Sequence, residues 1–165
     1  MINQKYLDEF SYEVFGASIE VHKIIGKGLL ENVYHQCLKE ELSQRKLNFF
    51  TEMRVPILYK GKELITDFRC DLFVENCLVV ELKTVSEINS IHQAQLLTYM
   101  KLLKASKGII INFNCFNNEE LRLIQLALIQ SDLKQSVGRA RTLRTNAIVK
   151  VYSNFPLRDA DEFIY

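Results

Sequence analysis

Apolar residues spaced three and four positions apart predict two helices at the start of the chain. Between residues 4 and 25, these steps place a set of apolar residues on one helical face: Leu7, Phe10, Val14, Ala17, Val21 and Ile24. Gly26 and Gly28 are expected to end this helix, because glycine readily adopts the left-handed conformation found at helix ends. A second helix is predicted over residues 29–46, with an inner side formed by Leu30, Val33, Cys37, Leu38 and Leu42.

The spacing of apolar residues then changes to one that is typical of strands. Residues 49–59 are expected to be extended, with Pro56 marking an edge or a break. Residues 64–74 and 77–83 predict the two strands of a hairpin, which turns at Glu75-Asn76.

Helices and strands are expected to alternate in the second half of the chain. The sequence predicts a helix over about 91–104, a buried strand over 108–113, a helix from Asn117 or Asn118 to about Gln135, and a strand over 147–152. This order predicts an α/β fold in which helices flank one mixed central β-sheet.

Length, charge and cysteine content narrow the class of protein. The 165 residues predict a single domain spanning 1–165, and a net charge of +1 excludes a strongly basic, histone-like protein. No apolar run reaches the roughly 18 residues needed to cross a bilayer, and the first residues do not form a signal peptide, so no membrane partner is expected. The four cysteines form no CxxC pair, which favours reduced thiols in a cytoplasmic protein over a zinc site.

Charged residues gather in the predicted hairpin. Because alternate residues of a strand share a face, Asp67, Arg69 and Asp71 are expected on one face of the first strand. Glu81 and Lys83 are expected to share a face of the second strand. Charges at the centre of a sheet need a partner or a function, and this hairpin offers both.

Metal-assisted cleavage of a phosphodiester would use these residues. Asp71 and Glu81 offer the carboxylate oxygens that hard cations such as Mg²⁺ prefer, and the Leu82 carbonyl offers another. Lys83 would orient or deprotonate the attacking water and stabilise negative charge. The alternative interpretation is a ladder of surface ion pairs on a two-faced sheet.

Two further elements carry candidate residues. Gln95 and Tyr99 lie four apart, so both would project from one face of the predicted helix toward a phosphate or Lys83. Glu31 opens the second helix, where it either complements the helix dipole or completes a metal site. The histidines are scattered, and structural or surface positions are expected for them.

Several strings occur in an order that resembles the GxxExxY family of the PD-(D/E)XK nuclease superfamily, over residues 10–114. They read IEVH at 19–22, GKGLLENVY at 26–34, DLFV at 71–74, VELK at 80–83, QAQLLTY at 93–99 and INFN at 111–114. The resemblance implies a restriction-endonuclease-like core and a Mg²⁺- or Mn²⁺-dependent nuclease that acts on DNA or, as the less favoured substrate, on RNA. It implies that Asp71, Glu81 and Lys83 form the D…ExK core. It also implies that Gln95 and Tyr99 form a QxxxY element and that Glu31 is the acidic residue of the N-terminal helices.

Residues 115–165 depart from this resemblance and predict a helix-strand extension packed on the core. Within them, residues 135–144 resemble the QxxGRxxR motif of superfamily 2 helicases, but the chain has no GxxxxGK[ST] loop to hold a nucleotide, so ATPase activity is not expected. The basic residues of this segment predict either a solvated loop or a nucleic-acid contact: Arg139, Arg141 and Arg144. Two alternatives stay open, a catalytically inactive module that binds nucleic acid or a protein, and a homodimer.

Overall fold

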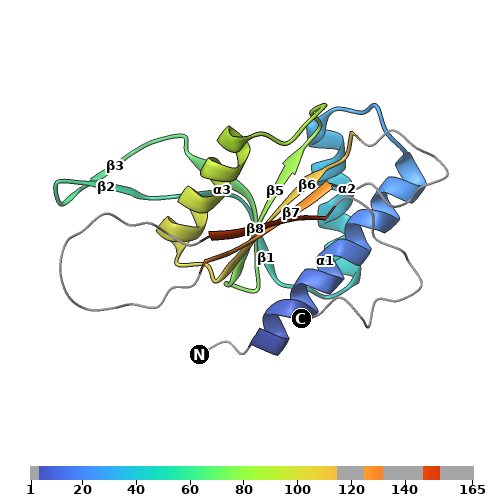
Figure 1. The fold of residues 1–165 in the computed structure, drawn as a ribbon, viewed down its shortest axis with the longest axis horizontal. Coiled ribbons are helices and arrows are strands. Elements are labelled where there is room, and N and C mark those ends of the chain that lie inside the picture. The colour runs from blue at the N-terminus through green and yellow to red at the C-terminus, as the bar shows by residue number, and fades with distance from the viewer. Residues whose placement is uncertain (1–3, 115–124, 132–146, 153–165) are drawn as a thin grey trace.

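One mixed sheet of six strands forms the centre of the molecule, with two helices on one face and one on the other (Figure 1). The structure is a computed structural model that describes residues 4–114, 125–131 and 147–152. The strand order is β1-β4-β5-β6-β7-β8. Only β5 and β6 run parallel among these neighbours. This architecture confirms the predicted α/β class and its restriction-endonuclease-like mixed sheet.

The first two helices cover one face of the sheet. They are α1 (Gln4–Ile25) and α2 (Glu31–Gln44). The predicted stripe of α1 is largely confirmed, since its central residues are buried, whereas Ile24 is exposed. The predicted inner side of α2 is partly wrong. Because this helix begins only at Glu31, Leu30 and Val33 are exposed and the buried face is formed by Tyr34, His35, Leu38 and Leu42.

Short turns organise the strands that follow. The strands are β1 (Phe49–Arg54), β2 (Ile57–Tyr59), β3 (Lys62–Leu64), β4 (Arg69–Val74) and β5 (Leu78–Lys83). The chain breaks between β1 and β2 at Pro56, as predicted, and β2 with β3 forms a separate hairpin that projects from the body (Figure 1). The predicted turn at Glu75-Asn76 is confirmed. Both residues have positive φ angles, 49° and 54°, which suits the right-handed twist of a tight hairpin.

The parallel pair β5–β6 requires a crossover, which α3 provides. The two elements are α3 (Ser90–Leu103) and β6 (Lys107–Asn112). Asn89 caps α3, because its side chain accepts hydrogen bonds from the first turn and its backbone N–H donates to His92 Nδ1. Gly108 lets α3 approach closely, because a Cβ there would lie 2.6 Å from Met100 Sδ.

Two more strands extend the sheet beyond β6. They are β7 (Gln125–Ser131) and β8 (Ala147–Tyr152). The predicted strand over 147–152 is confirmed, but the helix predicted from Asn117 or Asn118 to Gln135 is wrong, since residues 125–131 pair antiparallel with β6. The apolar run of this segment fills the place of a strand beside β6. Among the described residues, none of the helices has the length and apolar character of a membrane span.

Candidate active site

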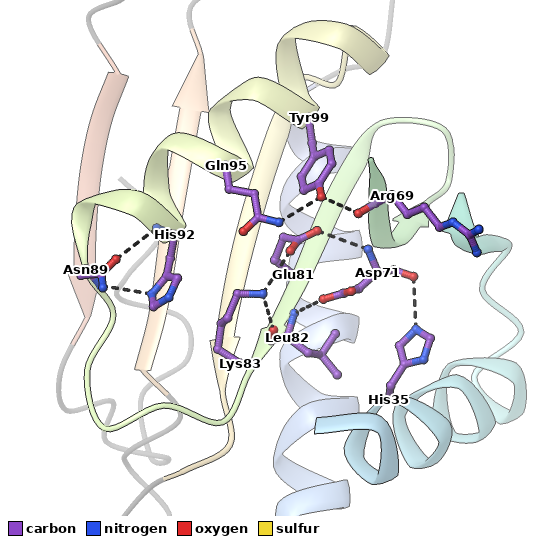
Figure 2. Close-up of polar contacts among 10 residues, drawn as sticks. All are labelled: His35, Arg69, Asp71, Glu81, Leu82, Lys83, Asn89, His92, Gln95 and Tyr99. Carbon is purple, nitrogen blue, oxygen red and sulfur yellow. Dashed lines mark hydrogen bonds and ion pairs between the residues drawn. The ribbon is translucent and has the colours of Figure 1, made fainter. Parts of the chain in front are cut away.

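The backbone pairing of β4 with β5 stops where the charged residues begin. The last paired residues are Leu72 and Val80. Beyond them, two carboxylates accept the hydrogen bonds that the opposite strand would otherwise receive. The Asp71 N–H donates to Glu81 Oε1 at 3.2 Å, and the Leu82 N–H donates to Asp71 Oδ2 at 2.7 Å. These bonds satisfy buried backbone donors and hold both carboxylates at the point where the strands separate (Figure 2).

The same point is where β4 changes the face to which its side chains point. Leu72 and Val74 pack in the cluster beneath α1 and α2, as the alternation predicts. Cys70 is buried with Phe73 in the cluster beneath α3, and Phe68 packs against that cluster. The expectation that Phe68 and Cys70 share a face with Leu72 is therefore wrong. β4 stays paired with β1 as far as Arg69, so the change of face coincides with two local features, the end of the pairing with β5 and a φ of 48° at Glu52 on β1.

Lys83 contacts two oxygen atoms of its own strand, one in the Glu81 carboxylate and one in the Leu82 carbonyl. Its Nζ is 3.2 Å from Glu81 Oε2 and donates to the Leu82 carbonyl at 2.8 Å. The Lys83 side chain is 13% exposed and that of Glu81 only 2%. The ammonium therefore balances a buried carboxylate and occupies a position between two oxygen atoms.

Burial changes the acid–base behaviour of Glu81. Its removal from water, together with the neighbouring Asp71 charge, raises the pKa of Glu81 from 4.5 to about 7, although Lys83 opposes the rise. Burial likewise raises the pKa of the Cys70 thiol to about 12, so this cysteine is not a nucleophile. Perturbed carboxyl groups of this kind cluster at functional sites.

Two residues one turn apart on α2 face the site. Burial raises the pKa of Glu31, Lys83 lowers it and Asp71 raises it, so Glu31 feels the charges of the site. His35 Nε2 lies 3.2 Å from the Asp71 carbonyl and 3.2 Å from Thr51 Oγ1. A carbonyl only accepts hydrogen bonds, so His35 Nε2 must carry the hydrogen in this contact. Histidine was expected only at structural or surface positions, and no sequence signal pointed to this contact.

From α3, Gln95 and Tyr99 approach the site from the opposite side (Figure 2). Gln95 Nε2 donates to the Tyr99 hydroxyl at 3.0 Å, which shows that both side chains lie on one helical face, as predicted. The Tyr99 hydroxyl in turn donates to the Arg69 carbonyl. Burial raises the pKa of Tyr99 to about 12, with smaller contributions from Glu81 and Asp71. The hydrogen bonds of this pair thus anchor β4 and do not run to Lys83.

The oxygen atoms of the site suit a hard cation, but they come from only two carboxylates and one backbone carbonyl. Asp71 and Glu81 offer carboxylate oxygens, the Leu82 carbonyl offers another, and the Lys83 ammonium already stands as a positive group between Glu81 and that carbonyl. Within residues 4–114, 125–131 and 147–152, no three His, Cys, Asp or Glu side chains are grouped closely enough to hold a metal ion. The expected trio of Glu31, Asp71 and Glu81 is therefore not assembled as a three-ligand group.

The basic residues Arg139, Arg141 and Arg144, and the helicase-like string that contains them, lie outside the described residues. Their expected contact with nucleic acid stays a prediction.

Comparison with known proteins gives one result. A family model described as the PD-(D/E)XK nuclease superfamily matches residues 8–124. A search of curated proteins and a search of solved structures each found no significant match. The matched range contains the crossed carboxylates, Lys83 and the residues of α2 and α3 that surround them.

Proposed function

Because the chain belongs to the PD-(D/E)XK nuclease superfamily, we propose that it is a metal-dependent nuclease that hydrolyses phosphodiester bonds in DNA. The observation that carries this proposal is the crossed pair of carboxylates with a lysine beside it. Asp71 and Glu81 each hold an N–H of the opposite strand, and Lys83 contacts Glu81. A surface ladder of ion pairs, the alternative interpretation, does not explain why Glu81 is buried.

Asp71, Glu81 and the Leu82 carbonyl would hold Mg²⁺ or Mn²⁺. When bound, such an ion polarises the phosphate and lowers the pKa of coordinated water. Of the residues in the chain, Lys83 has the clearest role, since its ammonium can move from the Leu82 carbonyl to orient the attacking water and stabilise charge on the phosphate. The Asp71 carboxylate keeps its orientation through the Leu82 N–H, and His35 holds the Asp71 backbone.

Side chains around this centre are proposed to support it. Glu31 adds a third negative charge that attracts cations, without joining the two carboxylates as a grouped ligand. Gln95 and Tyr99 fix β4 against α3 through the Tyr99 hydroxyl, and Gln95 lies on the α3 side of the site, beside Glu81 and Lys83 (Figure 2).

We further propose that the chain is of the GxxExxY type within the superfamily. In the string at residues 28–34, Gly28 has a φ of 93°, which favours glycine, and Glu31 faces the site. Tyr34 is buried, and its hydroxyl donates to the Gly26 carbonyl at 2.8 Å and accepts from the Leu29 N–H at 3.3 Å. Gly28 and Tyr34 thus shape and hold the turn before α2, and Glu31 faces the site from the first turn of that helix.

A cleavage assay tests the proposal. Purified protein is incubated with single- and double-stranded DNA and with RNA, in Mg²⁺, in Mn²⁺ and in chelator. Cleavage is expected only with metal, and Lys83→Ala is expected to lose about 100-fold or more in rate, the usual contribution of a positioned acid–base group. Lys101→Ala is the matched control, because Lys101 is an exposed lysine on α3.

Three results would separate the alternatives. Absence of cleavage on every substrate, or a Lys83→Ala variant as active as the wild type, contradicts the nuclease proposal. Salt-dependent binding that survives Glu81→Ala, without cleavage, would instead favour the inactive binding module. Binding that is unchanged in Arg139→Ala and Arg141→Ala would remove the proposed basic contact, and light scattering would decide whether the chain forms a homodimer.

A further inference from the structure

Backbone groups of the segment that leaves β5 just after the lysine are held by residues at the end of β6. The Lys83 carbonyl accepts the Phe113 N–H at 2.8 Å. The Thr84 backbone lowers the pKa of Glu31 against the rise caused by burial, so this residue lies near the start of α2. The residue after that, Val85, is held by Asn112. The lysine and the second residue after it are thus hydrogen-bonded to the end of β6.

Asn112 makes the most complete of these contacts. It is the last residue of β6, is 2% exposed, and lies in register with Lys83 across the parallel pair. Its Nδ2 donates to the Val85 carbonyl at 2.7 Å, and its Oδ1 accepts the Val85 N–H at 3.1 Å. The same Oδ1 accepts the Asn114 N–H at 3.2 Å. A primary amide is suited to this task, because it donates and accepts in one plane, as a strand backbone does.

The position of this contact relates it to the site. Regular pairing of β5 with β6 ends at Lys83–Asn112, so beyond that pair the backbone ladder no longer fixes the chain. Asn112 continues the pairing through its side chain, by the same device that Asp71 and Glu81 use between β4 and β5. A lysine has four rotatable side-chain bonds, so where its ammonium lies depends on how firmly its backbone is held.

We propose that Asn112 is a positioning residue, which fixes where the Lys83 ammonium lies by holding the Val85 backbone with two hydrogen bonds. We call these two hydrogen bonds the clamp. This inference rests on the proposed role of Lys83 in cleavage. Asn112 Nδ2 and Oδ1 bond to the Val85 backbone, so the proposed effect of Asn112 on Lys83 passes through the backbone of residues 83–85. Because misplacement of a reacting group by about 1 Å can cost on the order of 100-fold in rate, loss of the clamp is expected to lower kcat at least tenfold and to leave KM within twofold.

The variants are Asn112→Leu, which removes both contacts at similar volume, and Asn112→Asp, which keeps the acceptor and loses the donor. The matched control is Lys107→Met. Lys107 is at the other end of β6, is 3% exposed and pairs with Asp8 at 2.7 Å, so its loss lowers stability far from the site. Each variant is measured for kcat and KM, for hydrogen exchange of the Val85 amide, and for the ¹³Cε signal of Lys83 in ¹³C-lysine-labelled protein.

Both Asn112 variants are expected to lower kcat, to speed exchange at Val85 and to move the Lys83 signal, whereas Lys107→Met moves none of the three. If Asn112→Leu does not fold, the same three measurements on Asn112→Asp test the inference. The inference is overturned if the Lys83 signal stays in place, or if kcat falls no more than in Lys107→Met, while Lys83→Ala remains inactive. Failure of the proposed function has a different signature, namely a wild-type protein without cleavage, and the Lys83 signal still decides the clamp in that protein.

Discussion

Replacing Glu81 with glutamine should remove the pH dependence of stability that this buried carboxyl creates. The pKa of Glu81 is about 7 in the folded protein and 4.5 as its ordinary value. Between these values the folded state binds more protons at this group than the unfolded state does, so the free energy of unfolding falls as pH rises. Stability from this group is therefore complete below pH 4.5 and is lost as pH rises through 7.

The size of the effect follows from the same two values. At ~1.4 kcal/mol per pH unit, the interval from 4.5 to about 7 corresponds to ~3 kcal/mol. Glutamine keeps the acceptor for the Asp71 N–H and carries no charge at any pH. As pH rises over this range, the unfolding free energy of the wild type should therefore fall by ~3 kcal/mol relative to that of Glu81→Gln.

Urea unfolding followed by circular dichroism, in chelator and at a series of pH values, measures this difference. Subtracting one protein from the other cancels the titration of the groups that do not interact with Glu81. Glu40→Gln, on the exposed side of α2, is the control for the same replacement of a carboxylate by an amide away from the site. Mn²⁺ should restore the wild type above neutral pH, because a metal ion binds the ionised carboxylate.

Either of two results would refute the reasoning. If the wild type gains stability over Glu81→Gln as pH rises in chelator, the pairing with Lys83 outweighs burial and the pKa of Glu81 is lowered. A difference independent of pH would show that the carboxyl is solvated in solution.

Three further variants test the packing around the site. Tyr34→Phe removes a hydroxyl that bridges the turn before α2, and should lower the unfolding free energy in urea by about 1 kcal/mol and weaken Mn²⁺ binding in calorimetry; unchanged values for both would show that the bridge is dispensable. Tyr99→Phe leaves the Arg69 carbonyl without its donor and should lower the unfolding free energy by about 1–3 kcal/mol in the same assay. If β4 is displaced, the cleavage rate should fall by more than the fraction of unfolded protein explains. Gly108→Ala places a Cβ against Met100 and should cost about 1–3 kcal/mol by overpacking, which Met100→Ala should partly relieve; equal stability of wild type and Gly108→Ala would show that α3 shifts freely.

The spacing of apolar and turn residues predicted those elements that depend only on neighbouring residues in the sequence. The turn at Glu75-Asn76 and the first helix needed only the sequence around them, and the hairpin brought Asp71 near Glu81 as expected. The change of face at Asp71 could not be predicted, because it lies where β4 stops pairing with β5 and beside a left-handed residue, Glu52, on β1, and spacing within β4 shows neither. The strand β7 was also missed, since its apolar run suits a helix or a strand and the partner β6 decides between them.

The contact of His35 with the Asp71 carbonyl depends on how α2 packs across β1 and β4, which no spacing within α2 reveals. The same is true of Asn112, which lies 27 positions from Val85. Contacts between distant segments of this kind are set by the fold, and they surround a centre whose own residues lie close together in the sequence.

The tight turn between β4 and β5 has a consequence for the order in which the protein folds. A hairpin closed by two residues forms on a much shorter timescale than a parallel pair that must wait for a crossover helix. Asp71 and Glu81 therefore meet before β6 and α3 cover them, and two like charges in a new hairpin would oppose its formation. Lys83 follows Glu81 on the same strand, so we expect the nascent hairpin to carry its own counter-charge and to reach the growing sheet without help from a metal ion.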